Sequence, residues 1–155
     1  METQTVNGAL KHGVQFYVAL VNPIIKTLLR LGMPMGPMAL LSVRGRKSGR
    51  ERTTPVAIVE NNGGRYVTSV YGASQWVRNI RAAGEGKLAK RWRTRKVRIV
   101  ELSPGEAAPI LKHGLTMAPS FLKKYFEATA DSSIEELERD AKHHPVFKIE
   151  EAATN

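Results

Sequence analysis

The hydrophobic pattern of the chain changes at residues 32–37, which are rich in glycine and proline. Before this segment, apolar side chains recur every three or four residues from Val14 to Leu31, which predicts an amphipathic helix. Pro23 is expected to kink that helix or to start a second one after Asn22. After the segment come short apolar or alternating runs bounded by turn residues, which predict strands over 38–43, 53–60, 66–71, 86–93, 95–102 and 145–150.

Turn and capping residues separate the predicted elements. Residues 61–64, Asn-Asn-Gly-Gly, predict a tight hairpin turn because Asn and Gly tolerate positive φ. Ser74 and Gly84 are suitable caps for the two ends of a short helix, and Ser103 begins a capping box. Helices are therefore predicted over 75–83, from 104 to about 113, over 120–128 and over 133–143.

These elements define the expected fold class. About six strands joined mostly by hairpins, with peripheral helices, indicate an α+β protein built on an antiparallel sheet or a small barrel. A length of 155 residues suits a single domain over 1–155. Within it we expect an N-terminal amphipathic helical segment over 1–36, a barrel core over 38–102, and a helical C-terminal part with the last strand over 103–155.

The composition excludes several kinds of chemistry. The chain has no cysteine, which excludes disulfides, thiolate zinc sites, iron–sulfur clusters and cysteine nucleophiles. Its four histidines show no metal-ligand spacing, so no metal site is predicted. The apolar stretch over 14–31 contains Asn22, Pro23, Lys26 and Arg30 and is therefore not expected to span a membrane. The start of the chain lacks the basic region of a signal peptide, so a cytoplasmic protein is expected.

Positive charge is concentrated in two short windows. The formal net charge of the chain is +10, and the windows 44–52 and 78–98 carry +4 and +8, whereas 127–155 carries −5. This distribution indicates either an anionic partner or an ordinary solvated basic face. The sequence shows no helix-turn-helix, RNP or zinc-finger pattern, so a nucleic-acid-binding β-domain is only a minor alternative and no nucleic-acid partner is predicted.

The segment 45–55 carries the most informative chemistry. Its sequence Gly-Arg-Lys-Ser-Gly-Arg-Glu-Arg-Thr-Thr-Pro combines two glycines, which let backbone N–H groups approach a ligand, with hydroxyls and cations. Arginine can hold a phosphate through two parallel hydrogen bonds. The segment lacks the GxxxxGK[ST] pattern of a Walker loop. From the residues alone, it is either a phosphate cradle or an ordinary basic hairpin loop.

Two linked motifs carry a resemblance to a known family. Residues 45–49, Gly-Arg-Lys-Ser-Gly, and 52–56, Arg-Thr-Thr-Pro-Val, are followed by 69–72, Ser-Val-Tyr-Gly, and by Trp-Val-Arg-Asn at 76–79. This order resembles the deazaflavin-dependent nitroreductase family, most clearly over about 38–102. The resemblance implies a split β-barrel of the FMN-binding type. It also implies coenzyme F-420, an 8-hydroxy-5-deazaflavin with a phosphate and an oligoglutamate tail, with FMN as the less favoured cofactor.

The resemblance also implies which residues bind the cofactor. They are Arg46, Lys47, Ser48 and Arg52 at the phosphate, with the hydroxyls of Thr53 and Thr54, then Pro55 and Val56 beside the ring, Ser69, Tyr71 and Gly72 under the ring, and Trp76 and Asn79 on the helix that closes the pocket. Charge alone suggests that the basic window 78–98 faces the acidic tail.

The implied activity is hydride transfer from reduced F-420 to a hydrophobic acceptor, which is an activated C=C bond, a quinone, an unsaturated lipid or a nitro compound. The candidate proton donors are Tyr71 and Tyr125, and simple packing is the alternative for each. Further expectations are a small hydrophobic substrate, a monomer or homodimer, and peripheral membrane contact through the N-terminal helix. The alternative class is a non-catalytic split barrel that binds a flavin, a deazaflavin or a tetrapyrrole. We expect Trp92 to pack in a core or an interface rather than to stack on a nucleobase.

Overall fold

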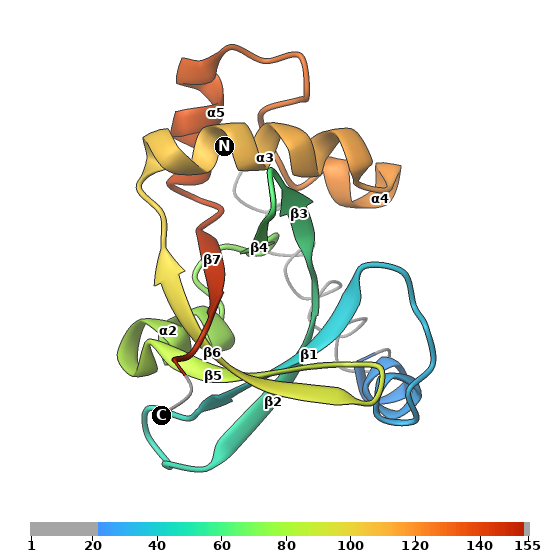
Figure 1. The fold of residues 1–155 in the computed structure, drawn as a ribbon. Coiled ribbons are helices and arrows are strands. Elements are labelled where there is room, and N and C mark those ends of the chain that lie inside the picture. The colour runs from blue at the N-terminus through green and yellow to red at the C-terminus, as the bar shows by residue number, and fades with distance from the viewer. Residues whose placement is uncertain (1–21, 154–155) are drawn as a thin grey trace, which may run out of the picture.

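Residues 22–153 are described by a computed structural model, and their strands form a curled antiparallel sheet (Figure 1). The order of the strands across the sheet is β2-β1-β5-β6-β7-β4-β3. Strand β2 also contacts β4, so the two ends of the sheet approach each other and the sheet makes a half-barrel. The strands are β1 (Met38–Arg44), β2 (Glu51–Ala57), β3 (Val59–Asn61), β4 (Gly64–Thr68), β5 (Glu85–Lys90), β6 (Arg93–Glu101) and β7 (Val146–Glu151).

Helices cover two sides of this sheet. In Figure 1, α3 and α5 lie together over the end that carries β3 and β4, whereas α2 lies at the opposite end, where it contacts β1 and β5. Helix α5 begins with a capping box in which Ser133 and Glu136 exchange hydrogen bonds, and the backbone N–H of Ser133 lowers the pKa of the Glu136 carboxyl. Within the described residues 22–30 are helical, and the labelled helices are α2 (Gln75–Ala83), α3 (Pro104–Met117), α4 (Ser120–Lys123) and α5 (Ile134–Ala141).

The buried apolar side chains form two clusters. The first fills the inside of the curled sheet and is closed by α2, which contributes Val77 and Ile80; its largest member is Phe147 of β7. The second lies between α3, α5 and the start of β7, where Leu111 and Leu137 are fully buried. Burial of each such side chain contributes roughly 1.5–3 kcal/mol. Strand β7 belongs to both clusters and therefore ties the helical part to the sheet.

Several sequence predictions are confirmed. The α+β class on an antiparallel sheet is observed, and α2 spans the predicted residues and ends at Gly84, whose φ of 69° is left-handed. The hairpin turn at 61–64 forms through Asn62 and Gly63, with φ angles of 47° and 77°. Of the capping box predicted at Ser103, one half is observed: the side chain of Ser103 accepts the N–H of Glu106, whereas the Glu106 carboxylate accepts from the Ser103 hydroxyl and not from its backbone N–H.

Some predicted boundaries were wrong. The run 53–60 is interrupted at Ile58, whose N–H donates to the carbonyl of Pro37, so β2 and β3 are separate and the described sheet has seven strands rather than about six. The strand predicted over 66–71 ends at Thr68 as β4, and the helix predicted over 120–128 is confined to α4. Helix α3 continues beyond the predicted end near His113. Of the helix predicted over 14–31, residues 14–21 lie outside the described residues.

The second hairpin turns earlier than predicted. Its turn residues are Arg91 and Trp92, and Arg91 has a positive φ of 56°. Trp92 therefore lies at the hairpin tip and is 78% exposed, so it does not pack in the core of the chain, and its packing in an interface stays a prediction. The sequence contains no glycine, proline or asparagine at this turn, and the local signal was therefore absent.

Gly86 of β5 lies close to the backbone of β1. A Cβ at this position would lie 2.5 Å from the backbone carbonyl oxygen of Ser42 and 3.2 Å from Cγ2 of Val43. Because that oxygen belongs to the backbone of β1, Gly86→Ala is expected to lower the free energy of unfolding by about 1–3 kcal/mol. The matched control is Gly114→Ala in α3, where a Cβ makes only an ordinary 3.6 Å contact with Val59.

Urea unfolding of the two variants measures both effects. Gly114→Ala is expected to raise the free energy of unfolding by about 0.5–1 kcal/mol, because alanine is the better helix former. Equal stability of the two variants would contradict the close approach of β1 and β5 at Gly86.

Candidate cofactor site

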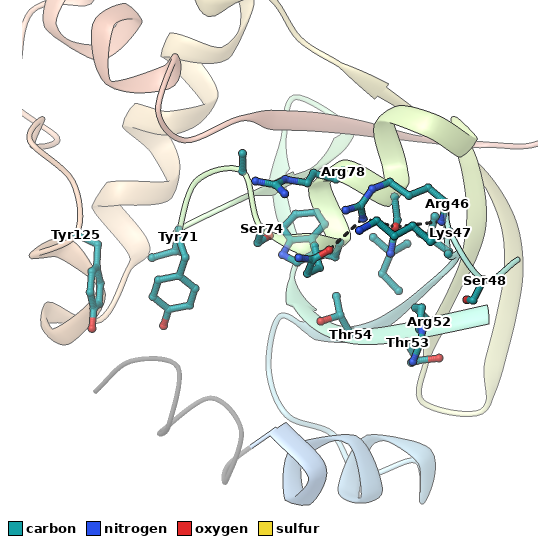
Figure 2. Close-up of a pocket in the computed structure, with 18 of the residues that line it drawn as sticks. Arg46, Lys47, Ser48, Arg52, Thr53, Thr54, Tyr71, Ser74, Arg78 and Tyr125 are labelled. Atoms are coloured by element: carbon teal, nitrogen blue, oxygen red, sulfur yellow. Dashed lines mark hydrogen bonds between the residues drawn. The ribbon is translucent and has the colours of Figure 1, made fainter. Parts of the chain in front are cut away.

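A cavity of about 1320 Å³ opens between the β1–β2 hairpin, the segment 70–74, the start of α2 and the residues after α4. Figure 2 shows its elongated arrangement: Arg46, Lys47 and Ser48 lie toward one end, and Tyr71 and Tyr125 lie at the other. Pockets for drug-sized ligands usually have volumes of about 300–1,000 Å³. The cavity therefore has room for a long ligand with chemically different ends.

The loop between β1 and β2 is folded tightly enough to present its backbone to the cavity. The N–H of Gly45 donates to the carbonyl of Arg50 at 2.8 Å, and the N–H of Gly49 donates to the carbonyl of Gly45 at 2.9 Å. Gly49 has a φ of 69°, which favours glycine. A Cβ at Gly45 would lie 3.0 Å from Oγ of Ser48 and 3.1 Å from the backbone carbonyl oxygen of Arg50, so the first glycine of the motif stands where the loop leaves little room for a side chain.

Helix α2 holds Arg46 in place. The backbone N–H of Arg46 donates to Oδ1 of Asn79 at 3.2 Å, and its Nη1 donates to the same oxygen at 2.9 Å and to Oε1 of Gln75 at 3.0 Å. Asn79 is buried, with 6% of its surface exposed. Both acceptors are neutral amides, so they orient the guanidinium without cancelling its charge.

The electrostatic character of the cavity is strongly positive. Its lining within the described residues includes no Asp or Glu side chain, and none of its cations forms an ion pair there. Low-dielectric walls lined by one sign of charge raise the local concentration of counter-ions. An anionic ligand is therefore favoured, and the cations that line the cavity are Arg46, Lys47, Arg52, Arg78 and Lys124.

The other end of the cavity is aromatic. The rings of Tyr71 and Tyr125 meet edge to face, with centroids 5.2 Å apart, and Nζ of Lys124 lies 5.4 Å from the centroid of Tyr125. Between the two ends, Trp76 lines the cavity and packs on Phe147. Oγ of Ser74 is buried there and has no hydrogen-bond partner within residues 22–153, so a ligand can supply one.

Most predicted site residues meet at this cavity, and four do not. Val56 is in the sheet core, Pro55 lies opposite Leu40 in the β1–β2 ladder, and Ser69 is buried and donates to the carbonyl of Gly72 at 2.5 Å. Pro55, Val56, Ser69 and Gly72 are outside the cavity lining, so no contact between them and a ligand is supported. The predicted residues that line the cavity are Arg46, Lys47, Ser48, Arg52, Thr53, Thr54, Tyr71, Trp76, Asn79 and Tyr125.

Sequence reasoning missed further lining residues. Gln75 and Arg78 lie on the same side of α2 as Asn79, and a helical-face argument from Asn79 would have found them. Of the basic window 78–98, only Arg78 lines the cavity, and the expectation that this window faces the cofactor tail stays a prediction. The complete set of missed residues is Leu41, Val43, Gly45, Val70, Ala73, Ser74, Gln75, Arg78 and Lys124.

Asn79 offers a direct test of this geometry. Asn79→Leu keeps the side-chain volume and removes both hydrogen bonds to Arg46, so it is expected to lower the free energy of unfolding by about 1–3 kcal/mol. Gln75→Leu is the control, because it removes one exposed bond to the same guanidinium and is expected to cost less than ~1 kcal/mol. Thermal unfolding of both variants measures the difference, and equal losses would contradict the anchoring role of Asn79.

The fold and the cavity define a split β-barrel of the FMN-binding type. An F-420H(2)-dependent reductase structure is similar to this chain, with a TM-score of 0.52, 21% identity, and coverage of 74% of this chain and 94% of that one. A structure described as a domain-swapped dimer has a TM-score of 0.54 and 24% identity, and the match covers 74% of this chain and 80% of that one. An FAD-binding protein from Mesorhizobium loti has a TM-score of 0.50 and 14% identity, with 80% and 86% covered.

A family model described as F-420H(2)-dependent quinone reductase matches residues 14–134, so the chain belongs to this family. The predicted deazaflavin family, reductase activity and F-420 cofactor are thereby confirmed. A comparison with curated proteins finds no match. In the part of the chain that the structure describes, no helix has the length and apolar character that crossing a membrane requires. The same part contains no cluster of three or more metal-ligating His, Cys, Asp or Glu side chains.

Proposed function

We propose that this chain holds reduced F-420 lengthwise in the cavity and reduces a quinone-type acceptor at the aromatic end. The observation that carries the proposal is the polarity of one continuous cavity, with Arg46 and Lys47 at one end and two phenols, beside Lys124, at the other. A cofactor with a phosphate, an acidic tail and a flat ring fits this arrangement, because its anionic groups can face the cations and its ring can lie against the apolar and aromatic lining.

The cationic end is proposed to hold the phosphate and the tail. Arg46 and Lys47 would bind the phosphate together with the hydroxyl of Ser48, and Arg52 and Arg78 extend the positive wall. Asn79 acts through Arg46, because it fixes the direction of the guanidinium, and it is therefore a positioning residue.

The middle of the cavity is proposed to hold the ring. Thr53 and Thr54 are on β2 and Trp76 is on α2, so they lie on different walls. Thr53 already shares a 2.8 Å hydrogen bond with Ser42, which leaves the hydroxyl of Thr54 and the unpartnered Oγ of Ser74 as the polar groups available to the ring.

Reduction of a quinone requires one hydride and one proton, and bound reduced F-420 supplies the hydride. The cavity lining within residues 22–153 contains no His, Asp, Glu or Cys, so the acids best suited to deliver the proton are the phenols of Tyr71 and Tyr125. A phenol that donates to the quinone oxygen must regain its proton from water, which can reach Tyr71 because this side chain is exposed.

A small hydrophobic substrate suits the aromatic end, and the family description names a quinone as the acceptor. The predicted monomer or homodimer stays a prediction; a similar structure is described as a domain-swapped dimer, and light scattering of the purified protein would distinguish the two states. A non-catalytic binding protein, the alternative, would bind the cofactor in the same cavity and would differ only in not transferring hydride from it to an acceptor.

The decisive experiment follows the absorbance of reduced F-420 when the purified protein is mixed with a water-soluble quinone. We expect saturable oxidation of F-420 that depends on the protein, and no acceleration by the protein over the uncatalysed rate when reduced FMN replaces F-420. Binding of F-420 without oxidation by quinones, enones or nitroaromatics would favour the storage alternative. Absence of F-420 binding would overturn the proposal.

A further inference from the structure

A buried acid–base pair joins the two segments that carry Tyr71 and Tyr125. Asp140 of α5 and His144, which stands shortly before β7, are 2% and 7% exposed, and Nε2 of His144 lies 3.6 Å from Oδ1 of Asp140. Neither residue lines the cofactor cavity, so the proposed function leaves both without a role. Burial of ionisable side chains costs free energy, and the contacts of the pair must offset that cost.

His144 holds the segment that carries Tyr71. Its Nδ1 lies 3.1 Å from the carbonyl oxygen of Ser69, and the N–H of Ser69 donates to the carbonyl of Pro145 at 2.9 Å. The hydroxyl of Ser69 closes the turn that follows, because it donates to the carbonyl of Gly72. Tyr71 lies within this turn, so the place of its side chain depends on where His144 holds Ser69.

The same pair holds the segment that carries Tyr125. Oδ2 of Asp140 accepts the backbone N–H of Ala128 at 3.0 Å, and the ring of Phe126 packs on that of His144 with centroids 4.2 Å apart. The two phenol rings thus come from segments fixed by one buried pair, and Figure 2 shows these rings side by side at the aromatic end of the cavity.

The hydrogen-bonding capacity of each group defines how the pair works. The carbonyl oxygen of Ser69 can only accept, so Nδ1 of His144 binds it as an N–H donor. Oδ1 of Asp140 is buried and has no hydrogen-bond partner within residues 22–153, and Nε2 of the ring faces it. A proton between Nε2 and Oδ1 makes this contact attractive, and it fixes the ring with Nδ1 toward Ser69.

We propose that Asp140 and His144 are positioning residues that hold the two phenols where the acceptor is protonated. This inference rests on the proposed function, which makes the phenols the proton donors. Proton transfer requires the donor within hydrogen-bond reach of the acceptor, and a misplacement of about 1 Å can cost about 10²-fold in rate. The pair contacts Ser69, Phe126 and Ala128, which are outside the cavity lining, so binding of F-420 is expected to be independent of it.

Kinetics of His144 variants test the proposal. His144→Leu removes the donor to Ser69 and is expected to lower kcat for quinone reduction at least tenfold, while the dissociation constant of F-420 stays within about twofold of the wild type. His144→Asn is the conservative variant, because its amide nitrogen takes the position of Nδ1 and can donate to the same carbonyl. Most of kcat is therefore expected to return.

Two variants test Asp140. The amide of Asp140→Asn can accept from Ala128 and donate to Nε2 of His144, so most of kcat is expected to remain. Asp140→Leu can do neither, and a loss of at least about tenfold is expected. The matched control is Leu111→Ala, which weakens the same helical cluster and is expected to lower the melting temperature while kcat stays within about twofold.

NMR of protein labelled at its tyrosine rings gives a readout that does not depend on turnover. The centroids of Tyr71 and Tyr125 are 5.2 Å apart, so a nuclear Overhauser effect between their ring protons is expected in the wild type. Tyr71→Phe and Tyr125→Phe assign the signals. The effect is expected to disappear in His144→Leu and to persist in His144→Asn and Leu111→Ala.

Three outcomes would overturn the positioning role. The first is a folded His144→Leu with normal kcat and an unchanged contact between the tyrosine rings. The second is an equal loss of kcat in His144→Leu, His144→Asn and Leu111→Ala, which would show a general effect of stability. The third, which needs no variant of the pair to fold, is nitrogen NMR of the wild type that shows Nδ1 of His144 without a hydrogen.

Failure of the proposed function has a different signature. It would show as a wild type that does not oxidise F-420 with quinones, although the contact between the tyrosine rings is present and is lost in His144→Leu. That result would contradict the proposed function alone, because the contact measures the placement of the rings directly.

Discussion

Arg46→Ala and Lys47→Ala are each expected to weaken the binding of F-420 about tenfold to hundredfold, which corresponds to about 1.4–2.7 kcal/mol. The reason is that each removes one charged donor from the cationic end of the cavity, where hydrogen bonds to ionised groups contribute roughly 1.5–3 kcal/mol. A fluorescence titration of each purified variant with F-420 measures the dissociation constant directly.

The loop provides its own control. Arg50 has the same charge as Arg46 and is in the same loop, but it is outside the cavity lining. Arg50→Ala is therefore expected to change the dissociation constant less than threefold, on the order of 0.6 kcal/mol. Equal weakening by Arg50→Ala and Lys47→Ala would mean that only long-range charge matters and would contradict a specific phosphate contact. An F-420 dissociation constant that none of the three substitutions changes would show that the loop does not contact the cofactor.

The double variant Tyr71→Phe/Tyr125→Phe is expected to lower kcat for quinone reduction by about 10²-fold, the lower range for loss of a general acid. Phenylalanine keeps the edge-to-face packing of the two rings and removes only the hydroxyls. F-420 affinity is therefore expected to stay within about twofold of the wild type. Steady-state oxidation of reduced F-420 at saturating quinone gives kcat.

The two single variants assign the donor. If one phenol delivers the proton, its single variant shows nearly the whole loss and the other shows little. A double variant with normal kcat would mean that the proton comes from solvent, and the two tyrosines would then only shape the aromatic end.

The fold was predictable where adjacent residues have a strong conformational preference of their own. Asn62 and Gly63 occupy the positive-φ positions of a hairpin turn, and Gly84 ends α2 with a left-handed φ, so local residue preferences were sufficient. The break at Ile58 could not be predicted, because its N–H is redirected to Pro37 by the curvature of the sheet. Curvature is a property of the assembled strands, and the strongly β-forming run 53–60 contains no local residue signal for it.

The candidate site shows the same division. The cationic loop was recognisable because glycine, hydroxyl and basic residues are adjacent in the sequence. Lys124 and Ser74 were not, because their place in the cavity depends on how α4 and α2 pack against the sheet. Pro55 and Val56 were assigned to the ligand from motif position alone, and the structure places Val56 in the core of the sheet and Pro55 opposite Leu40 in the β1–β2 ladder.

The position of β7 in the sheet has a consequence for biosynthesis. This strand is the last of the described strands to be translated, yet it lies between β6 and β4 and completes both of their ladders. Until residues 146–151 have left the ribosome, the nascent chain holds two unconnected pieces with open edges, which are prone to pair with other chains. Closure of the half-barrel is therefore a late, long-range event, and we expect slow folding and dependence on chaperones during synthesis.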